Sequence, residues 1–330
     1  MPKPGELRSR LFKIRPETGF NEMALDVFRY QYENNRVYRS YVDHLGVDVN
    51  KISHYTEIPF LPIAFFKSHQ VVTGSFEPQA VFSSSGTTGS STSRHYIKDP
   101  GLYEESFLTG FRLFFGEPED HVIIGLLPSY LERKGSSLVY MTQKLIDMSG
   151  HEESGFYLHD YEALHELLKV LKSRQKRTIL LGVTYALLNM AESFPLNFPE
   201  LIVMETGGMK GRRKEMVREE LHQILRRGFG VRNIYSEYGM TELLSQAYSK
   251  GNGLFSAPPW MKVLIRDAND PFTWLEDGRS GGINVIDLAN IHSCSFIETQ
   301  DLGKKHPDGS FEVLGRFDNS DVRGCNLLVI

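Results

Sequence analysis

Residues 178–235 read TILLGVTYALLNMAESFPLNFPELIVMETGGMKGRRKEMVREELHQILRRGFGVRNIY. Three short runs in this stretch, at 178–183, 201–204 and 231–235, are typical of buried strands. A helix through Met190 separates the first two runs, and a charged helix over 214–227 separates the last two. Strands that alternate with helices predict an α/β domain with a largely parallel sheet.

The segments before residue 178 extend this pattern. A buried strand is expected over 121–127, followed by amphipathic helices over 136–148 and 161–172. Apolar residues at helical spacing predict a helix over 21–45. The prolines within 58–66 favour an extended, buried connection over a central strand.

The pattern changes after about Tyr248 to short strands separated by turns, expected over 262–266, 282–288, 295–299 and 311–314. The dipeptide Asp308-Gly309 lies between the last two and predicts a hairpin. We therefore expect four parts: a helical segment over 1–75, an α/β core over 76–250, a β-rich subdomain over 251–315, and a hinge with a short tail over 316–330.

Composition excludes several classes of protein. The 330 residues are 41% hydrophobic and 24% charged, as in soluble globular proteins. The net charge of −4 gives no basic excess for nucleic acid, so no nucleic-acid partner is expected. Two cysteines cannot form a disulfide framework and indicate a reducing compartment. With no apolar stretch long enough for a membrane span and no apolar signal-peptide core, we expect a cytoplasmic location.

The most distinctive local feature is the loop at residues 83–94, which reads SSSGTTGSSTSR. Its glycines allow close backbone approach to a ligand, and its closely spaced N–H groups and hydroxyls would make an anion nest suited to phosphate. It is not a Walker A loop, because the Gly-Lys-Ser/Thr ending is missing. A flexible polar linker is the alternative interpretation.

The second feature is the pentapeptide YGMTE at residues 238–242, which follows the strand expected over 231–235. Ligands bind at the carboxyl ends of strands in open α/β sheets. The Thr241 hydroxyl could hold a phosphate oxygen and the Glu242 carboxylate could hold Mg²⁺. A surface turn before a helix is the alternative.

Together the two motifs resemble those of the adenylate-forming enzymes: acyl-CoA synthetases, adenylation domains and luciferases. Three further segments match in order: TGGM at 206–209, TQDLG at 299–303 and GRFD at 315–318. The resemblance implies an α/β fold, that of the adenylation N-terminal domain with a β-rich subdomain, and it implies ATP and Mg²⁺ as cofactors.

The resemblance also assigns roles to particular residues. The triphosphate would lie in the loop formed by Ser84, Ser85, Gly86, Thr87, Thr88 and Gly89. The rest of the nucleotide would lie among Thr206, Gly207, Gly208, Tyr238, Gly239, Met240, Asp301 and Arg316. Within this set Tyr238 and the Gly207-Gly208 pair would flank adenine, Asp301 would bind ribose, and Arg316 would mark the hinge. Thr241 would hold the α-phosphate and Glu242 the metal.

The end of the sequence narrows the resemblance to the acyl-protein synthetases of bacterial fatty acid reductase. Only twelve residues follow Asp318, so we expect a strongly truncated C-terminal lid. In that family a cysteine close to the C-terminus receives the acyl group, which implies Cys325. A thiolate is nucleophilic near neutral pH, and Arg323 could lower the pKa of Cys325. The alternative is that Cys325 is a small, buried hydrophobic residue. That is the role expected for Cys294.

The implied reaction is the ATP-dependent activation of a carboxylic acid to acyl-AMP. The first expectation for the acid is a long-chain fatty acid. The acyl group would then pass to Cys325 as a thioester and on to an acyl reductase or acyl carrier partner. The phosphate loop departs from the family pattern, because Ser93-Arg94 stands where a lysine is usual. Two alternatives stay open: an acyl- or aryl-CoA ligase like phenylacetate-CoA ligase, and a non-catalytic nucleotide- or acyl-binding scaffold.

Overall fold

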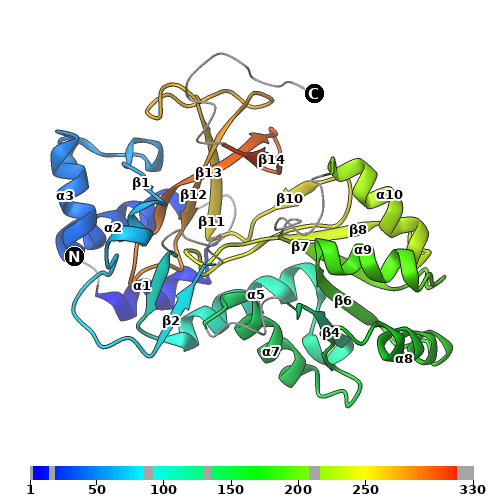
Figure 1. Cartoon of the computed structure of the whole chain (residues 1–330). Coiled ribbons are helices and arrows are strands. Elements are labelled where there is room, and N and C mark those ends of the chain that lie inside the picture. The colour runs from blue at the N-terminus through cyan, green and yellow to red at the C-terminus, as the bar shows by residue number, and fades with distance from the viewer. Residues whose placement is uncertain (1–2, 15–18, 85–91, 129–134, 208–215, 318–330) are drawn as a thin grey trace.

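The computed structural model describes residues 3–14, 19–84, 92–128, 135–207 and 216–317. Within these residues, twelve strands form one large mixed sheet (Figure 1). In sheet order they are β11 (Met261–Arg266), β12 (Ser280–Asp287), β13 (Phe296–Lys305), β14 (Phe311–Arg316), β10 (Leu254–Ser256), β9 (Ala247–Ser249), β8 (Ile234–Tyr238), β7 (Ile202–Thr206), β6 (Thr178–Val183), β4 (Val122–Leu126) and β5 (Gly155–Phe156), with β1 (Leu61–Pro62) paired to β13. A separate hairpin joins β2 (Ala80–Ser83) to β3 (Arg94–Ile97).

Helices precede and surround this sheet. They are α1 (Pro4–Leu11), α2 (Phe20–Asn34), α3 (Arg36–His44), α4 (Phe65–Ser68), α5 (Pro100–Phe115), α7 (Ser137–Ser149), α8 (Tyr161–Ser173), α9 (Thr184–Ser193) and α10 (Arg218–Phe229), with 3-10 turns at Val49–Lys51, Tyr55–Glu57 and Pro118–Asp120. In the described part of the chain, none of the helices combines the length and the apolar character that a membrane crossing requires.

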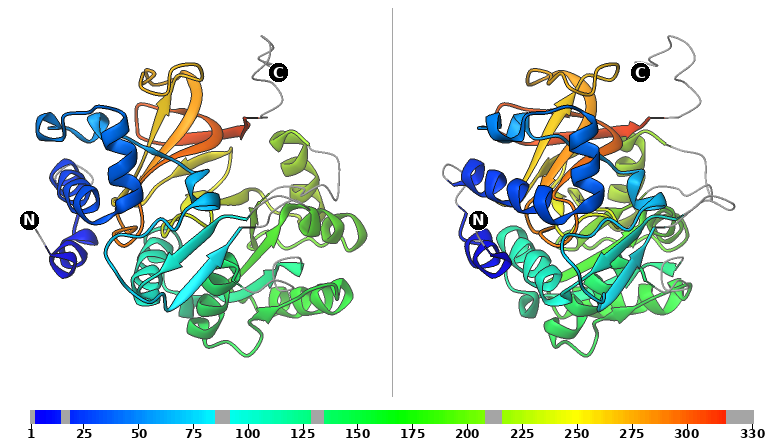
Figure 2. Two further views of the ribbon diagram at one scale, coloured as in Figure 1. Left: turned by 60° about the vertical axis from the view of Figure 1, so that its left-hand side comes forward. Right: turned by 90° about the vertical axis from the view of Figure 1, so that its left-hand side faces the viewer.

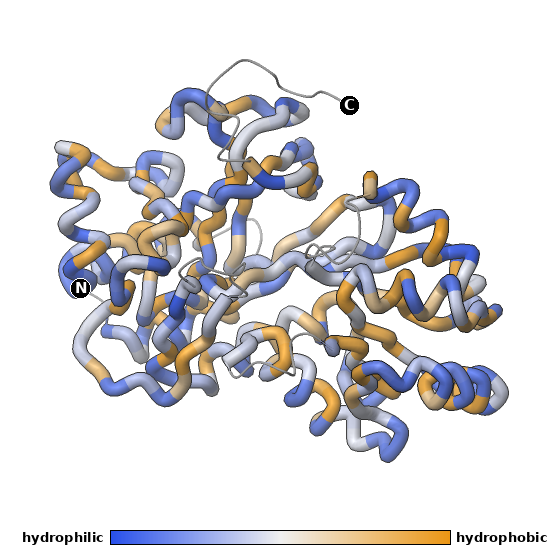
Figure 3. Tube along the Cα trace, viewed as in Figure 1, coloured by the Kyte–Doolittle hydropathy of each residue, from blue (hydrophilic) through white to orange (hydrophobic). Residues whose placement is uncertain are grey.

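Strands β5, β4, β6, β7 and β8 are parallel, and helices cover both of their faces. Strand β6 shows why, since its side chains alternate between two cores. Leu180 packs with α8, α9 and α10, whereas its neighbours Ile179 and Leu181 pack with α5 and α7. Figure 3 shows apolar residues along β4 and β6, while the surface helices mix apolar and polar residues. The predicted α/β class with a largely parallel sheet is confirmed.

The second half of the sheet is antiparallel and continues from β8 through β9 and β10 to β14, β13, β12 and β11. The hairpin predicted at Asp308-Gly309 is present between β13 and β14. Its His306 N–H donates to the Ser310 carbonyl at 2.8 Å, and Gly309 has a φ of +84°. The predicted β-rich region is therefore built onto the edge of the parallel strands.

The helix predicted over 21–45 is two helices, α2 and α3, because Asn35 interrupts it. The Asn35 carboxamide oxygen accepts a hydrogen bond from the Tyr38 N–H and caps α3. Its amide nitrogen donates to the Ser293 carbonyl at 2.9 Å, so this fully buried side chain also ties the helices to the β-rich part.

The strand predicted over 231–235 begins later, since β8 runs from Ile234 to Tyr238. Gly230 ends α10 in a left-handed conformation with φ +65°, and the Val231 N–H still bonds to the Arg226 carbonyl. Residues 231–233 therefore connect the end of α10 to the start of β8. As a result Tyr238 is the last residue of the strand, and the rest of YGMTE follows its carboxyl end.

Candidate active site

The Ser/Thr/Gly loop is carried by the hairpin β2–β3, which crosses between the parallel half and the β-rich half (Figure 2). Two serines close the base of the loop. The Ser84 N–H donates to the Ser93 carbonyl at 3.1 Å, and the Ser93 N–H donates to Ser84 Oγ at 2.9 Å. Residues Ser85, Gly86, Thr87, Thr88 and Gly89 lie outside the described part of the chain.

Strand β3 brings the base of this loop against Thr241 and Glu242. The buried His95 ring donates through Nδ1 to the Thr241 carbonyl at 2.8 Å. Burial lowers the pKa of His95 to about 4, so its imidazole is neutral near pH 7. Burial raises the pKa of Glu242, and a hydrogen bond with the Ser93 side chain acts in the opposite direction. The base of the loop and the YGMTE motif, about 150 residues apart in the sequence, therefore lie in contact in the structure.

The residues after Glu242 are held by buried polar side chains of the β-rich half. Both carboxylate oxygens of Asp287 are used: Oδ2 accepts from the Leu244 and Ser245 N–H groups at 2.7 and 3.0 Å, and Oδ1 accepts from the Ser245 hydroxyl at 2.6 Å. The Asn290 amide donates to the Glu242 carbonyl at 2.7 Å. These bonds fix the backbone on which Thr241 and Glu242 stand.

Tyr238, Asp301 and Arg316 form a chain of hydrogen bonds. The Tyr238 hydroxyl donates to Asp301 Oδ2 at 2.8 Å, and Arg316 Nε donates to Oδ1 at 3.0 Å. The Tyr238 ring is buried, with edge-to-face contacts to Phe255 and Phe311 at centroid distances of 6.0 and 5.7 Å. Three residues that the sequence assigned separately to adenine, ribose and the hinge therefore contact one another.

The carboxyl end of β7 lies beside the hydrogen-bonded residues Tyr238, Asp301 and Arg316. The Thr206 hydroxyl donates to a carboxylate oxygen of Glu237 on β8, and the Thr184 hydroxyl donates to the Gly207 carbonyl at 2.8 Å. Gly207 has a φ of +66°, a left-handed conformation that favours glycine. Gly208 lies outside the described residues.

Gly239 and Met240 form the turn that leads from Tyr238 to Thr241. A Cβ on Gly239 would lie 2.3 Å from Glu237 Oε1, so a larger residue would require that carboxylate to shift. The Met240 carbonyl accepts from the Leu243 N–H at 3.1 Å and closes the turn. The proposed acyl acceptor Cys325 lies outside the described residues.

Sequence reasoning did not single out two buried titratable residues of this site. The first is His95, whose ring joins the hairpin to Thr241. Glu237 is buried against Glu205 on the neighbouring strand, and burial raises its pKa to about 7, with the Glu205 carboxylate adding to the shift. The available signal was a glutamate at an inward position of a strand, directly before the YGMTE motif.

The donor set of the site fits a magnesium ion shared with a substrate. Among the described residues, no group of three or more histidine, cysteine or acidic side chains converges on a point. Mg²⁺ is commonly held by one or two carboxylates together with substrate phosphates. The buried Glu242 carboxylate at the base of the loop could supply one such ligand.

No family model matches the chain. Over 335 aligned residues it is 23% identical to a long-chain-fatty-acid–luciferin-component ligase of Vibrio harveyi, an alignment that covers 93% of this chain and 86% of that protein. This similarity confirms the resemblance inferred from the motifs.

Solved structures with the same fold are adenylate-forming ligases. An open conformation of 2-hydroxyisobutyryl-CoA ligase, in complex with 2-HIB-AMP and CoA, matches 97% of this chain and 75% of its own at a TM-score of 0.69 and 12% identity. ATP-bound MatB from Rhodopseudomonas palustris matches 72% of this chain at a TM-score of 0.55 and 19% identity. The match spans about half of MatB, 48% of that chain. The predicted fold, that of the adenylate-forming enzymes, is confirmed.

Proposed function

We propose that this protein activates a carboxylic acid with ATP, forming acyl-AMP and releasing pyrophosphate, and that the acid is a long-chain fatty acid. The observation that carries the proposal is the contact between the two motifs. The hairpin that bears the Ser/Thr/Gly loop is bonded through Ser93 and His95 to Glu242 and Thr241. The similarity to the Vibrio harveyi ligase supports a fatty acid as the substrate.

In the proposed first step, a carboxylate oxygen of the acid attacks the α-phosphorus of ATP. The new O–P bond forms as the bond to the β-phosphate oxygen breaks, and pyrophosphate leaves with its electron pair. The Thr241 hydroxyl would orient an α-phosphate oxygen, and Glu242 would hold Mg²⁺ beside the triphosphate. Such catalysis rests on positioning and on charge stabilisation.

Nucleotide binding would rearrange the hydrogen bonds of Asp301. Both of its oxygens already accept bonds from Tyr238 and Arg316. Ribose hydroxyls would replace or share these donors, which leaves the carboxylate satisfied in both states. Arg316, whose side chain is 79% exposed, would be the donor that moves most easily.

In the proposed second step, the Cys325 thiolate attacks the acyl carbon of acyl-AMP, a thioester forms, and AMP leaves. A partner such as an acyl reductase or acyl carrier would then receive the acyl group. Cys294 is unsuited to this role, because it is fully buried in the core and burial raises the pKa of its thiol to about 12.

The test is ATP–pyrophosphate exchange with a panel of acids that includes decanoate, tetradecanoate and phenylacetate. We expect exchange with the fatty acids, and exchange with none of the acids would refute the proposed activity. Incubation with ATP, Mg²⁺ and labelled tetradecanoate should give an acyl-protein that hydroxylamine cleaves.

The acceptor is tested with two matched cysteine variants. Cys325→Ala should retain exchange but lose the labelled protein, whereas Cys294→Ala should keep both. If Cys325→Ala makes acyl-CoA when coenzyme A is added, at the rate of the unaltered protein, the coenzyme A ligase alternative is correct instead.

A further inference from the structure

Strands β6 and β7 leave the sheet at the same level, and a side chain continues their pairing by one more hydrogen bond. Val183 is the last residue of β6 and pairs with Thr206, the last residue of β7. One position further along each strand, the Thr184 hydroxyl donates to the Gly207 carbonyl at 2.8 Å. Thr184 is also the first residue of α9 and is buried, so water does not compete for this bond.

A buried carboxylate and a buried histidine lie behind this hydroxyl. Glu205 Oε2 is 3.3 Å from Thr184 Oγ1, and Glu205 Oε1 is 3.7 Å from His222 Nε2 on α10. Among the described residues, His222 Nε2 makes no hydrogen bond, and the Glu205 carboxylate is the acidic group beside it. The hydroxyl has one proton, which points to the Gly207 carbonyl as the nearer of its two acceptors.

Gly207 begins the turn that follows β7, and its own chemistry does not fix its conformation. Its φ of +66° lies in the left-handed region, which glycine populates about as readily as the right-handed one. Support comes from both faces of the sheet, because successive residues of a strand point to opposite faces. Thr184 lies on the face of Glu205, and Glu237 accepts the Thr206 hydrogen bond on the other.

We propose that Thr184 is a positioning residue of the nucleotide site, whose hydroxyl fixes the Gly207 carbonyl and with it the turn that would flank adenine. The inference rests on the proposed adenylation function, which gives that turn its ligand. Thr184 would touch neither the nucleotide nor the reacting atoms, and it would act only through Gly207. Without this bond the turn would sample several conformations, and only a fraction of the molecules would be ready to bind the nucleotide.

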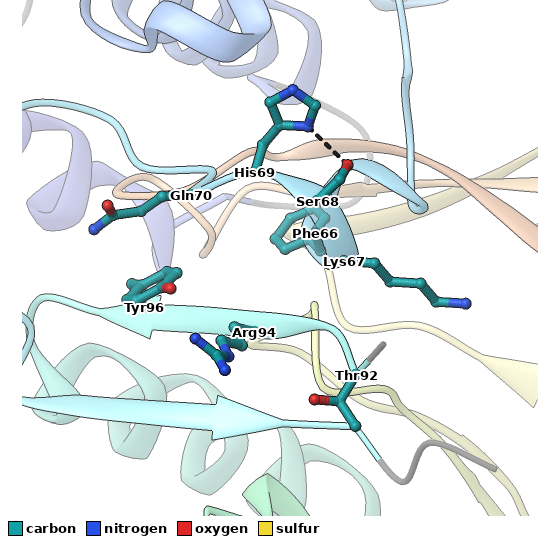
Figure 4. Close-up of a pocket in the computed structure, with 8 residues that line it drawn as sticks. All are labelled: Phe66, Lys67, Ser68, His69, Gln70, Thr92, Arg94 and Tyr96. Carbon is teal, nitrogen blue, oxygen red and sulfur yellow. Dashed lines mark hydrogen bonds between the residues drawn. The ribbon is translucent and has the colours of Figure 1, made fainter. Parts of the chain in front are cut away.

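The Thr184 hydrogen bond is separate from the hairpin that carries the Ser/Thr/Gly loop. A polar pocket of about 500 Å³ opens beside that hairpin, between α4 and β3, and Figure 4 shows the side chains that line it. These side chains come from positions 66–70 and 92–96, and none of them belongs to α9, β7 or α10. Loss of the Thr184 hydroxyl should therefore weaken contacts to adenine and leave ligand groups beside the hairpin unaffected.

The experiment is calorimetry on the full chain with AMP and with ATP. Thr184→Val keeps the shape of the side chain and removes the hydroxyl, and we expect it to bind both nucleotides about 3- to 10-fold more weakly, the range for one neutral hydrogen bond. Thr184→Ser keeps the hydroxyl and should restore both affinities to within about twofold. In exchange assays, Thr184→Val should raise the KM for ATP and leave the KM for pyrophosphate within about twofold.

The matched control is Thr178→Val, at the other end of the same strand. Thr178 is buried, and its hydroxyl donates to the Lys176 carbonyl at 3.0 Å, so the substitution removes a comparable hydrogen bond at the opposite edge of the sheet. Both valine variants should lose a similar amount of stability in urea denaturation. Thr178→Val should nevertheless bind AMP and ATP as the unaltered protein does.

Unchanged AMP affinity in Thr184→Val overturns the inference, and so does an equal loss in Thr178→Val or a failure of Thr184→Ser to restore binding. An unaltered protein that binds neither AMP nor ATP overturns both this inference and the proposed function. The proposed function alone fails if no acid supports exchange while AMP binding still depends on the Thr184 hydroxyl.

Discussion

Replacing Glu237 with glutamine should make the protein more stable at alkaline pH. Glu237 is 8% exposed, and its carboxylate lies beside Thr206 and the buried Glu205. Burial raises its pKa from 4.5 to about 7, because water no longer solvates the charged form. Glutamine has nearly the same shape, stays neutral at every pH, and can accept the Thr206 hydrogen bond through its amide oxygen.

The sign and size of the effect follow from proton linkage. Below about pH 4.5 both folded and unfolded chains carry the proton, so the free energy of unfolding owes nothing to this group. Between pH 4.5 and 7 the unfolded chain loses the proton first, and the free energy of unfolding falls as pH rises. Above pH 7 the loss is complete and amounts to about 3 kcal/mol for a shift of this size.

The measurement is urea denaturation of both proteins at pH 5, 6, 7 and 8. The free energies of unfolding of the two proteins should be about equal near pH 5. At pH 8 that of Glu237→Gln should be higher by about 3 kcal/mol. Glu276→Gln removes a charge from an exposed turn and should change stability by less than about 1 kcal/mol at each pH. A stability difference between Glu237→Gln and the unaltered protein that is the same at pH 5 and pH 8 would refute the reasoning.

Three further predictions concern the nucleotide site and its support. Glu242→Gln should abolish Mg²⁺-dependent ATP–pyrophosphate exchange without loss of fold. Full exchange activity in this variant would refute the assignment of Glu242 as the metal ligand. Asp301→Ala should weaken ATP binding by about 1.5–3 kcal/mol in calorimetry, and unchanged affinity would exclude the carboxylate from the ribose site. Asp287→Ala leaves three buried N–H groups without their acceptor and should lower the free energy of unfolding by at least about 3 kcal/mol, as read from urea denaturation.

Local sequence predicted those parts of the fold whose signal is local. The run at 178–183 is apolar throughout and forms β6 with the predicted bounds, because both of its faces are covered by helices. The hairpin at Asp308-Gly309 was predicted for a similar reason, because the conformation of a tight turn depends mainly on the residues within it. The hairpin β2–β3 was missed, because the pairing of Ala80–Ser83 with Arg94–Ile97 is not marked by alternation in either short strand.

Sequence reasoning named candidate site residues where they form a motif, and it did not name residues whose environment is set by burial. The motif at 238–242 could be read from its order of residues. Glu237 and His95 could not, because each acquires its shifted pKa from segments more than thirty positions away that exclude water.

The pairing of β1 with β13 has a consequence for the order in which the chain can fold during synthesis. Leu61 pairs with Ile297, and the Gln31 side chain donates to the Asn290 carbonyl, 259 positions further along the chain. Helices α2 and α3 therefore leave the ribosome long before the strands that cover their apolar faces exist. Contacts between such distant segments form slowly, and the exposed intermediates are prone to aggregate. The apolar faces of the N-terminal helices therefore remain uncovered until β13 has been synthesised.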